Sequence, residues 1–190
     1  MKKKIKSLHI AIDGSSASGK TTASKIISKK FKLKLLSSGK LYRYIAYKII
    51  KNKNKYNKNI IKKFSKSISE KNLNSKKLYS QDITKLSSIV AKKKYIRNFL
   101  KNYQIDFIKK NKFVIIEGRD IASKILPNAD LKLFFRCSVR KKALRRFQEF
   151  KKNNSSIKIK EVEKALKLRD FSDKNRKESP LLFVKGAVLV

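Results

Sequence analysis

Short apolar runs alternate with amphipathic stretches along the 190 residues of this chain. Residues 8–12, 113–116 and 131–135 are compact apolar runs with polar flanks, which is typical of strands buried on both faces. Two shorter runs, at 33–36 and 188–190, indicate further short strands. The hydrophobic pattern therefore predicts several short strands spread over the whole length of the chain.

Apolar residues recur at helical spacing between these runs. The expected helices are 20–31, one beginning near residue 39, then 96–107, 139–150 and 161–169. Strands that alternate with helices predict an α/β fold with a parallel central sheet. The length suits a single domain, residues 1–190, with a small appended lobe.

Two polar stretches interrupt this alternation. Residues 52–77 are rich in Lys, Asn and Ser, with an apolar set at Ile60, Ile61 and Phe64 that indicates one helix. We expect the rest of that stretch to be mobile, as an insertion or a small lobe. Residues 151–160 are polar throughout, so we expect a loop there.

The strongest chemical signal follows the first predicted strand. Two glycines, Gly14 and Gly19, are separated by four residues and are followed by Lys20 and Thr21, which is the P-loop pattern in its required context between strand and helix. Glycine allows backbone N–H groups to turn inward around phosphate, and Lys20 reaches the β- and γ-phosphates. The predicted ATP-binding residues of this loop are Gly14, Ser15, Ser16, Ala17, Ser18, Gly19, Lys20, Thr21 and Thr22, with Thr21 also predicted as a ligand of Mg²⁺. The alternative is a small-residue turn that binds nothing.

The chain is strongly basic, with 52 Lys and Arg against 13 Asp and Glu and a formal net charge of +39. One interpretation is a polyanionic partner such as nucleic acid. The other is compositional drift, which we favour because the lysines are spread along the chain. The few arginines are instead concentrated in short motifs, and their planar forks suit phosphate better than lysine does.

Composition also bears on the cellular setting. The chain has one cysteine, Cys137, which excludes an internal disulfide framework and fits a reducing cytoplasm. It has no run of eighteen apolar residues, so we expect no membrane span. His9 lies within a predicted strand, where a structural role is expected, and Cys137 is expected to be a small buried residue.

Four further segments, 37–43, 117–121, 145–146 and 169–176, follow the P-loop in order. The Asp-x-x-Gly and Asn-Lys-x-Asp motifs of GTPases are absent from the sequence. Together with the P-loop, the four segments resemble the bacterial cytidylate kinases from about residue 10 to the end, most weakly over 52–77. The resemblance implies a P-loop kinase fold with a parallel central sheet flanked by helices. It also implies a small acceptor-binding lobe, approximately 40–90 with a shortened insertion, and a mobile lid, approximately 140–176.

The resemblance assigns roles residue by residue. The acceptor-binding residues that it implies are Ser38, Tyr42, Arg43, Ser88, Arg97, Arg119, Asp120, Arg169, Asp173 and Arg176. It places Arg145 and Arg146 in the lid over the donor triphosphate, and the implied catalytic set is Lys20, Arg119, Arg145 and Arg176. An ionised Asp120 only accepts hydrogen bonds, so it suits the exocyclic amino group of cytosine and not the carbonyl of uracil. Ser15 stands where the family usually has proline, which we expect to loosen the entry of the loop.

The expected function is transfer of the γ-phosphate of ATP, with Mg²⁺, to CMP or dCMP, giving ADP and CDP or dCDP. We expect a cytoplasmic monomer with no membrane partner and no nucleic acid as substrate. The alternatives are a sibling monophosphate kinase with another acceptor and a basic nucleic-acid-binding protein on a decayed kinase fold. Single motifs also have plainer explanations: a solvated turn at 117–120, a solvated helix face at 145–146, surface ion pairs at 169–176, and Tyr42 as a core residue.

Overall fold

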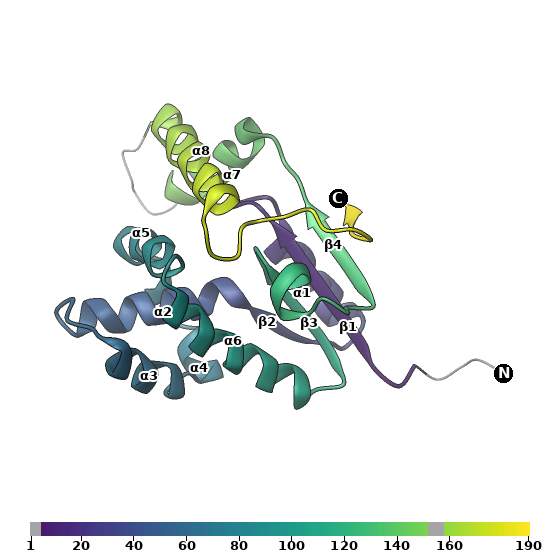
Figure 1. Ribbon diagram of the computed structural model, residues 1–190. Coiled ribbons are helices and arrows are strands. Elements are labelled where there is room, and N and C mark those ends of the chain that lie inside the picture. The colour runs from purple at the N-terminus through teal and green to yellow at the C-terminus, as the bar shows by residue number, and fades with distance from the viewer. Residues whose placement is uncertain (1–4, 152–157) are drawn as a thin grey trace. The chain divides into compact units, whose positions relative to one another are not determined.

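The computed structural model describes residues 5–151 and 158–190 (Figure 1). The chain divides into two compact units. The first unit combines Met1–Leu35 with Phe113–Val190, and the second is the intervening Leu36–Lys112. The predicted bounds of the acceptor lobe and of the lid are not tested by this division, so they stay predictions.

A five-stranded sheet forms the centre of the fold, with the strand order β2-β3-β1-β4-β5. Its strands are β1 (Leu8–Gly14), β2 (Lys34–Ser37), β3 (Phe113–Gly118), β4 (Leu131–Phe135) and β5 (Val188–Leu189). β1 pairs in parallel with both β3 and β4, so that Ile10 lies opposite Ile115 on one side and Leu131 on the other. Because parallel strands point the same way, the carboxyl ends of β1, β3 and β4 lie at one edge, and the predicted parallel α/β sheet is confirmed.

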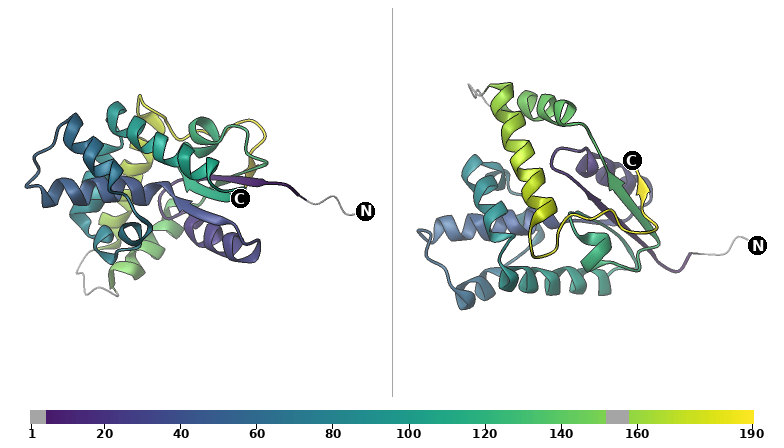
Figure 2. Two further views of the ribbon diagram at one scale, coloured as in Figure 1. Left: turned by 90° about the horizontal axis from the view of Figure 1, so that it is seen from below. Right: turned by 45° about the horizontal axis from the view of Figure 1, so that its top comes forward.

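Helices of the first unit pack on this sheet and on one another. They are α1 (Lys20–Lys30), the π-helical turn η2 (Ile121–Ile125), α7 (Val139–Lys151) and α8 (Ile159–Asn175). The core between α1 and the sheet gathers Ile10, Ile12, Leu33 and Ile115. α7 and α8 lie side by side in Figures 1 and 2, and a small apolar core of Ala143, Val162 and Leu166 with Phe147 and Ile159 joins them.

The second unit is helical apart from the end of β2. Its elements are α2 (Ser38–Lys51), α3 (Lys58–Lys66), α4 (Glu70–Leu73), the 3₁₀ helix η1 (Lys76–Tyr79), α5 (Gln81–Val90) and α6 (Lys94–Lys109). α2 carries its apolar residues along one side and packs against α5, η1 and α6. Leu41, Ile45 and Ile49 of α2 are fully buried, as are Ile96 and Leu100 of α6.

Three sequence predictions need correction here. Residues 52–77 hold two α-helices, not one, because Ser69 caps a second helix by accepting from the Asn72 N–H at 3.3 Å. The helix α5 was not predicted, since its buried side includes the polar Ser87 between Ile83 and Val90 and so breaks the apolar pattern. The helix expected at 161–169 continues to Asn175, and its last turns carry Asp170, which pairs with Lys142 of α7, and Asp173, which pairs with Arg119.

The loop expected at 151–160 falls mainly outside the described residues, and its last two residues already belong to α8. Within the described ranges, no helix combines the length and the apolar character that crossing a membrane requires.

Candidate active site

The loop from Gly14 to Gly19 joins the end of β1 to the start of α1. Gly14 has φ +155°, and a Cβ at this position would lie 2.5 Å from the Phe135 carbonyl oxygen of β4. Only glycine fits so close an approach of two backbones. Ala17 and Gly19 are both left-handed, with φ +57° and +98°. Left-handed residues in such a loop turn successive N–H groups toward one side, which favours an anion.

Hydrogen-bond donors are left available where α1 begins. Gly19 occupies the N-cap position and offers no side-chain cap, and the first turn of α1 has no acidic residue. The free amides and the positive end of the helix dipole both favour phosphate at this point. The buried Ser18 hydroxyl also has no hydrogen-bond partner among the residues that the structure describes. The Ser18 hydroxyl and the N-terminus of α1 can therefore donate to an anion in this loop.

Lys20 is almost completely buried at the base of this loop, with 6% of its surface exposed. Its Nζ donates to the Ser15 carbonyl oxygen at 2.9 Å. The pKa of Lys20 is lowered from 10.5 to about 7, chiefly by burial and then by the charges of Arg119 and Arg169, while Glu117 opposes the shift. A bound polyphosphate would place negative charge beside Lys20 and would favour its protonated form.

Oxygen ligands for a divalent cation lie beside Lys20. The Thr21 hydroxyl is at an exposed position and donates to the Glu117 carboxylate at 3.0 Å, and Glu117 itself is buried. A hydroxyl beside a carboxylate fits Mg²⁺, which prefers hard oxygen ligands and keeps several waters or phosphate oxygens. Among the described residues, no group of three or more His, Cys, Asp or Glu could hold a metal ion alone. A metal at Thr21 and Glu117 would thus depend on oxygens from a phosphate or from water.

The guanidinium groups of Arg119 and Arg176 meet in the same unit of the structure. Arg119 Nε donates to Asp173 Oδ2 at 2.8 Å, and Arg176 Nη1 lies 3.6 Å from Asp173 Oδ1. Arg176 Nη2 also lies 3.9 Å from Asp120 Oδ1. Burial raises the pKa of Asp173, but Arg119, Arg169 and Arg176 outweigh it and hold this pKa below its usual range. The carboxylates of Asp120 and Asp173 thus hold Arg119 and Arg176 in place.

Asp13 is a functional residue that the sequence interpretation missed. It is 2% exposed at the end of β1, and its two oxygens accept from the N–H groups of Ile121 at 2.9 Å and Ala122 at 2.8 Å. Burial raises its pKa to about 6, against the lowering effect of these two N–H groups. The carboxylate secures the turn after β3 that carries Arg119 and Asp120. The signal in the sequence was an acidic residue, Asp13, directly after the apolar residues of a predicted buried strand.

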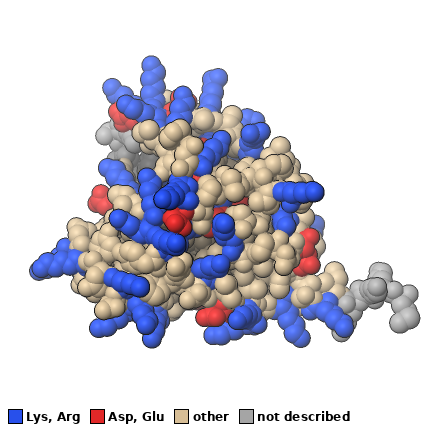
Figure 3. All heavy atoms as spheres, in the orientation of Figure 1, with Lys and Arg blue, Asp and Glu red and all other residues tan. Residues whose placement is uncertain are grey.

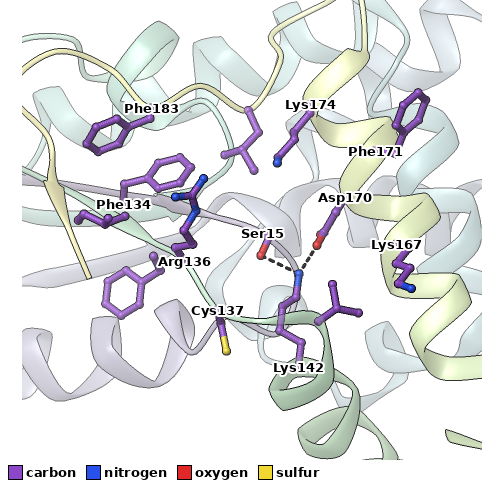
Figure 4. A pocket seen from close by; sticks show the side chains of 14 residues that line it. Ser15, Phe134, Arg136, Cys137, Lys142, Lys167, Asp170, Phe171, Lys174 and Phe183 are labelled. Carbon is purple, nitrogen blue, oxygen red and sulfur yellow. Dashed lines mark hydrogen bonds and ion pairs between the residues drawn. The ribbon is translucent and has the colours of Figure 1, made fainter. Parts of the chain in front are cut away.

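α7 brings two cations to the phosphate loop. The Arg145 Nη1 atom lies 3.3 Å from the point that a Cβ on Gly19 would occupy, so this guanidinium group is beside the loop. The buried Lys142 lies one turn earlier, 3.2 Å from the Ser15 hydroxyl, and it also pairs with Asp170 of α8 (Figure 4). Sequence reasoning missed both Lys142 and Asp170. Arg146 instead pairs with Glu149 at 2.6 Å on the exposed side of α7.

A pocket of about 520 Å³ opens beside Lys142 and Asp170. Phe134 and Phe183 line it (Figure 4). Their rings pack edge to face, with centroids 5.3 Å apart. Cys137 lies at its wall and is half-buried, so the expectation of a buried cysteine is wrong: it follows the end of β4, where the chain leaves the sheet.

The second unit gathers the other predicted acceptor-binding residues on α2, α5 and α6. Arg43 Nη1 donates to the Leu78 carbonyl at 2.9 Å and to the Thr84 hydroxyl at 2.8 Å. Arg97 Nη1 donates to the Ala91 carbonyl at 3.0 Å, and its guanidinium group lies 5.4 Å from the centre of the buried Tyr42 ring. The remaining two are Ser38, buried at the start of α2, and Ser88, whose hydroxyl donates to the Thr84 carbonyl at 3.3 Å. Their roles in binding stay predictions.

Comparisons with known proteins agree on one family. The family model described as cytidylate kinase matches residues 10–190. A cytidylate kinase of Phytoplasma mali is 35% identical over 202 residues, covering 98% of this chain and 87% of its own length. A cytidylate kinase of Fusobacterium nucleatum is 37% identical over 185 residues, covering 90% and 84%.

A solved structure supports the fold alone. The crystal structure of an uncharacterised protein from Eubacterium ventriosum has a TM-score of 0.51 at 16% identity, covering 96% of this chain and 85% of that one. The family match spans nearly all of the chain and includes the phosphate loop, the turn after β3, and Arg169 and Arg176. This chain belongs to the cytidylate kinase family.

Proposed function

We propose that the protein transfers the γ-phosphate of ATP to CMP or dCMP. The observation that carries this function lies in the first unit, where a phosphate loop built around Lys20 faces a second set of cations. Arg119 and Arg169 lie near enough to Lys20 to lower its pKa. One phosphate-binding site beside another is what a phosphotransferase between two nucleotides requires.

The chemistry needs no covalent intermediate on the protein. Two nucleotide phosphates repel each other, and guanidinium groups at their junction neutralise that repulsion and the charge that spreads in the transition state. We assign this task to Arg119 and Arg176, whose positions Asp173 fixes, and to Arg145 beside Gly19. Lys20 binds the transferred end of the donor.

Mg²⁺ is the proposed metal, held through Thr21 with Glu117 accepting from that hydroxyl. When bound, it supplies positive charge to the donor phosphates. We further propose that the protein works as a monomer in the cytoplasm, in pyrimidine nucleotide metabolism, where a lone Cys137 would stay reduced.

A coupled assay of ADP release with CMP, dCMP, UMP and AMP as acceptors tests this function. We expect turnover with CMP and dCMP, much slower turnover with UMP, and none with AMP. Good turnover of another monophosphate without turnover of CMP would instead identify a sibling kinase. Replacement of Lys20 by Met should abolish turnover, while Lys25→Met, on the exposed side of α1, should retain it.

Base selection is assigned to Asp120 together with Ser88 and Arg97. Asp120 is buried and faces Arg176, so its carboxylate only accepts hydrogen bonds. Asp120→Asn keeps the size and adds a donor, which a uracil carbonyl can accept. We expect the ratio of kcat/KM for CMP over UMP to fall by about tenfold. The exposed Asp106→Asn on α6 is the matched control, and an unchanged ratio in Asp120→Asn removes this residue from base reading.

A further inference from the structure

A largely buried ion pair lies against the phosphate loop. Lys142 of α7 and Asp170 of α8 are joined through Nζ and Oδ2, with side chains that are 3% and 15% exposed. The pair also contacts the loop itself, because Lys142 Nζ lies 3.2 Å from the Ser15 hydroxyl and Asp170 Oδ1 accepts from the Ser16 N–H at 3.4 Å. Figure 4 shows Lys142 between Ser15 and Asp170.

The Asp170 carboxylate makes the contacts that a phosphate would make. It accepts from a backbone amide of the loop and from a buried ammonium group, which are the two kinds of donor that bind polyphosphate in such loops. The contact with Ser16 is long at 3.4 Å, so it is a weak hydrogen bond that a stronger acceptor can replace. In the free protein, the Asp170 carboxylate therefore uses donors that could otherwise bind a phosphate.

Lys142 and Arg145 both lie beside the phosphate loop. They are three residues apart on α7, and residues at that spacing lie on neighbouring parts of a helix surface. Arg145 lies beside Gly19 at one end of the loop, and Lys142 lies beside Ser15 at the other end. A polyphosphate in the loop would then lie near a cation at each end.

We propose that Lys142 is a donor-phosphate-binding residue, held in position by Asp170, and that the donor polyphosphate displaces the Asp170 carboxylate from Ser16 and Lys142. This proposal deepens the proposed function, since it rests on the loop being the donor site. Asp170 acts in two ways: it holds the Lys142 ammonium group in place before binding, and it weakens donor binding by competition. Removing its charge therefore tightens the binding of an anion.

Binding of inorganic tripolyphosphate, measured by calorimetry, tests the proposal without any acceptor or turnover. We expect Lys142→Gln to weaken binding at least tenfold, as the loss of one charge-assisted hydrogen bond implies, and Lys142→Arg to restore it to within about threefold. Asp170→Asn should tighten binding by about fivefold. The control is Lys167→Gln, which removes an exposed positive charge from the same pocket and should change binding less than about twofold.

Other results would overturn the proposal. Equal affinity of Lys142→Gln and Lys167→Gln would remove Lys142 from the donor site. Unchanged or weaker binding by Asp170→Asn would show that the ion pair only stabilises the packing of α7 against α8. Because Lys142→Gln leaves a carboxylate without its ion-pair partner, the double variant with Asp170→Asn is included, and its affinity should fall between those of the two single variants. The readout distinguishes this proposal from the proposed function, since tripolyphosphate binding does not depend on which acceptor is used.

Discussion

At the phosphate loop, one ammonium group lies among two guanidinium groups and two carboxylates. Lys20 is buried and feels Arg119 and Arg169 on one side and Glu117 and Asp173 on the other, and its pKa falls to about 7. The free protein therefore holds Lys20 largely neutral at slightly alkaline pH. A polyphosphate favours the charged form, so binding and protonation are coupled at this residue.

Proton uptake measures that coupling. Binding of inorganic tripolyphosphate at pH 8 should take up about one proton at Lys20, because its pKa rises from about 7 in the free protein to well above 8 in the complex. Calorimetry in two buffers of different ionisation enthalpy reports the number of protons. Lys25→Met on the exposed side of α1 should keep the uptake, and Lys20→Met should lose it. Equal binding enthalpies in the two buffers would contradict the expected titration.

At the scale of elements, the loop depends on how closely β1 and β4 approach. Gly14 ends β1 in register with Phe135, the last residue of β4. A side chain at Gly14 would meet the Phe135 carbonyl oxygen at 2.5 Å and its Cβ at 2.9 Å. Backbone atoms cannot turn aside as a flexible side chain can, so the two strands would have to separate where the phosphate loop begins.

Gly14→Ala should therefore lower the free energy of unfolding by about 3 kcal/mol, as measured by urea denaturation. Gly186→Ala is the matched control, since Gly186 also has a positive φ, of 77°, but a Cβ there would have no neighbour within 4 Å. Its cost should be about 1 kcal/mol, from backbone strain alone. An equal loss of unfolding free energy in the two variants would show that the contact with Phe135 does not contribute to the cost.

At the scale of the whole molecule, the net charge of +39 is the most unusual property. In Figure 3 the Lys and Arg side chains are scattered over the visible face, with few acidic residues between them. A dispersed charge attracts polyanions without recognising any sequence or shape. We therefore treat nucleic-acid binding as a by-product of composition, separate from the nucleotide site.

Salt dependence separates the two interpretations. Binding to duplex DNA should fall by at least about a thousandfold between about 50 mM and 200 mM salt, while CMP turnover persists at the higher salt with DNA present. A charge-balanced protein of similar size serves as the control for the assay. Tight DNA binding that survives 200 mM salt, in a protein without kinase activity, would favour the decayed-kinase alternative.

The local pattern of apolar and polar residues was enough to predict the strands, and the local motif was enough to predict the chemistry of the phosphate loop. A buried strand must be apolar, and a phosphate loop needs glycines and a lysine at fixed spacing, so residues 8–21 were predictable as they stand. The strand at 131–135 was also predicted to the residue. Local pattern failed for α5, where Ser87 occupies a buried position, and for the last turns of α8, where Asp170 and Asp173 pair with Lys142 and Arg119 of other elements.

The sequence by itself therefore determined the parallel α/β class, the phosphate loop and, through motif order, the family. Only the tertiary structure decided which charges meet: Asp173 between Arg119 and Arg176, Asp13 under the turn after β3, and Asp170 with Lys142 at the loop. The physical reason is that periodicity encodes burial within one element. Among these contacts only that of Asp173 with Arg176 joins residues close together in the chain. The others join residues that lie far apart, and only the packing of strands and helices brings them together.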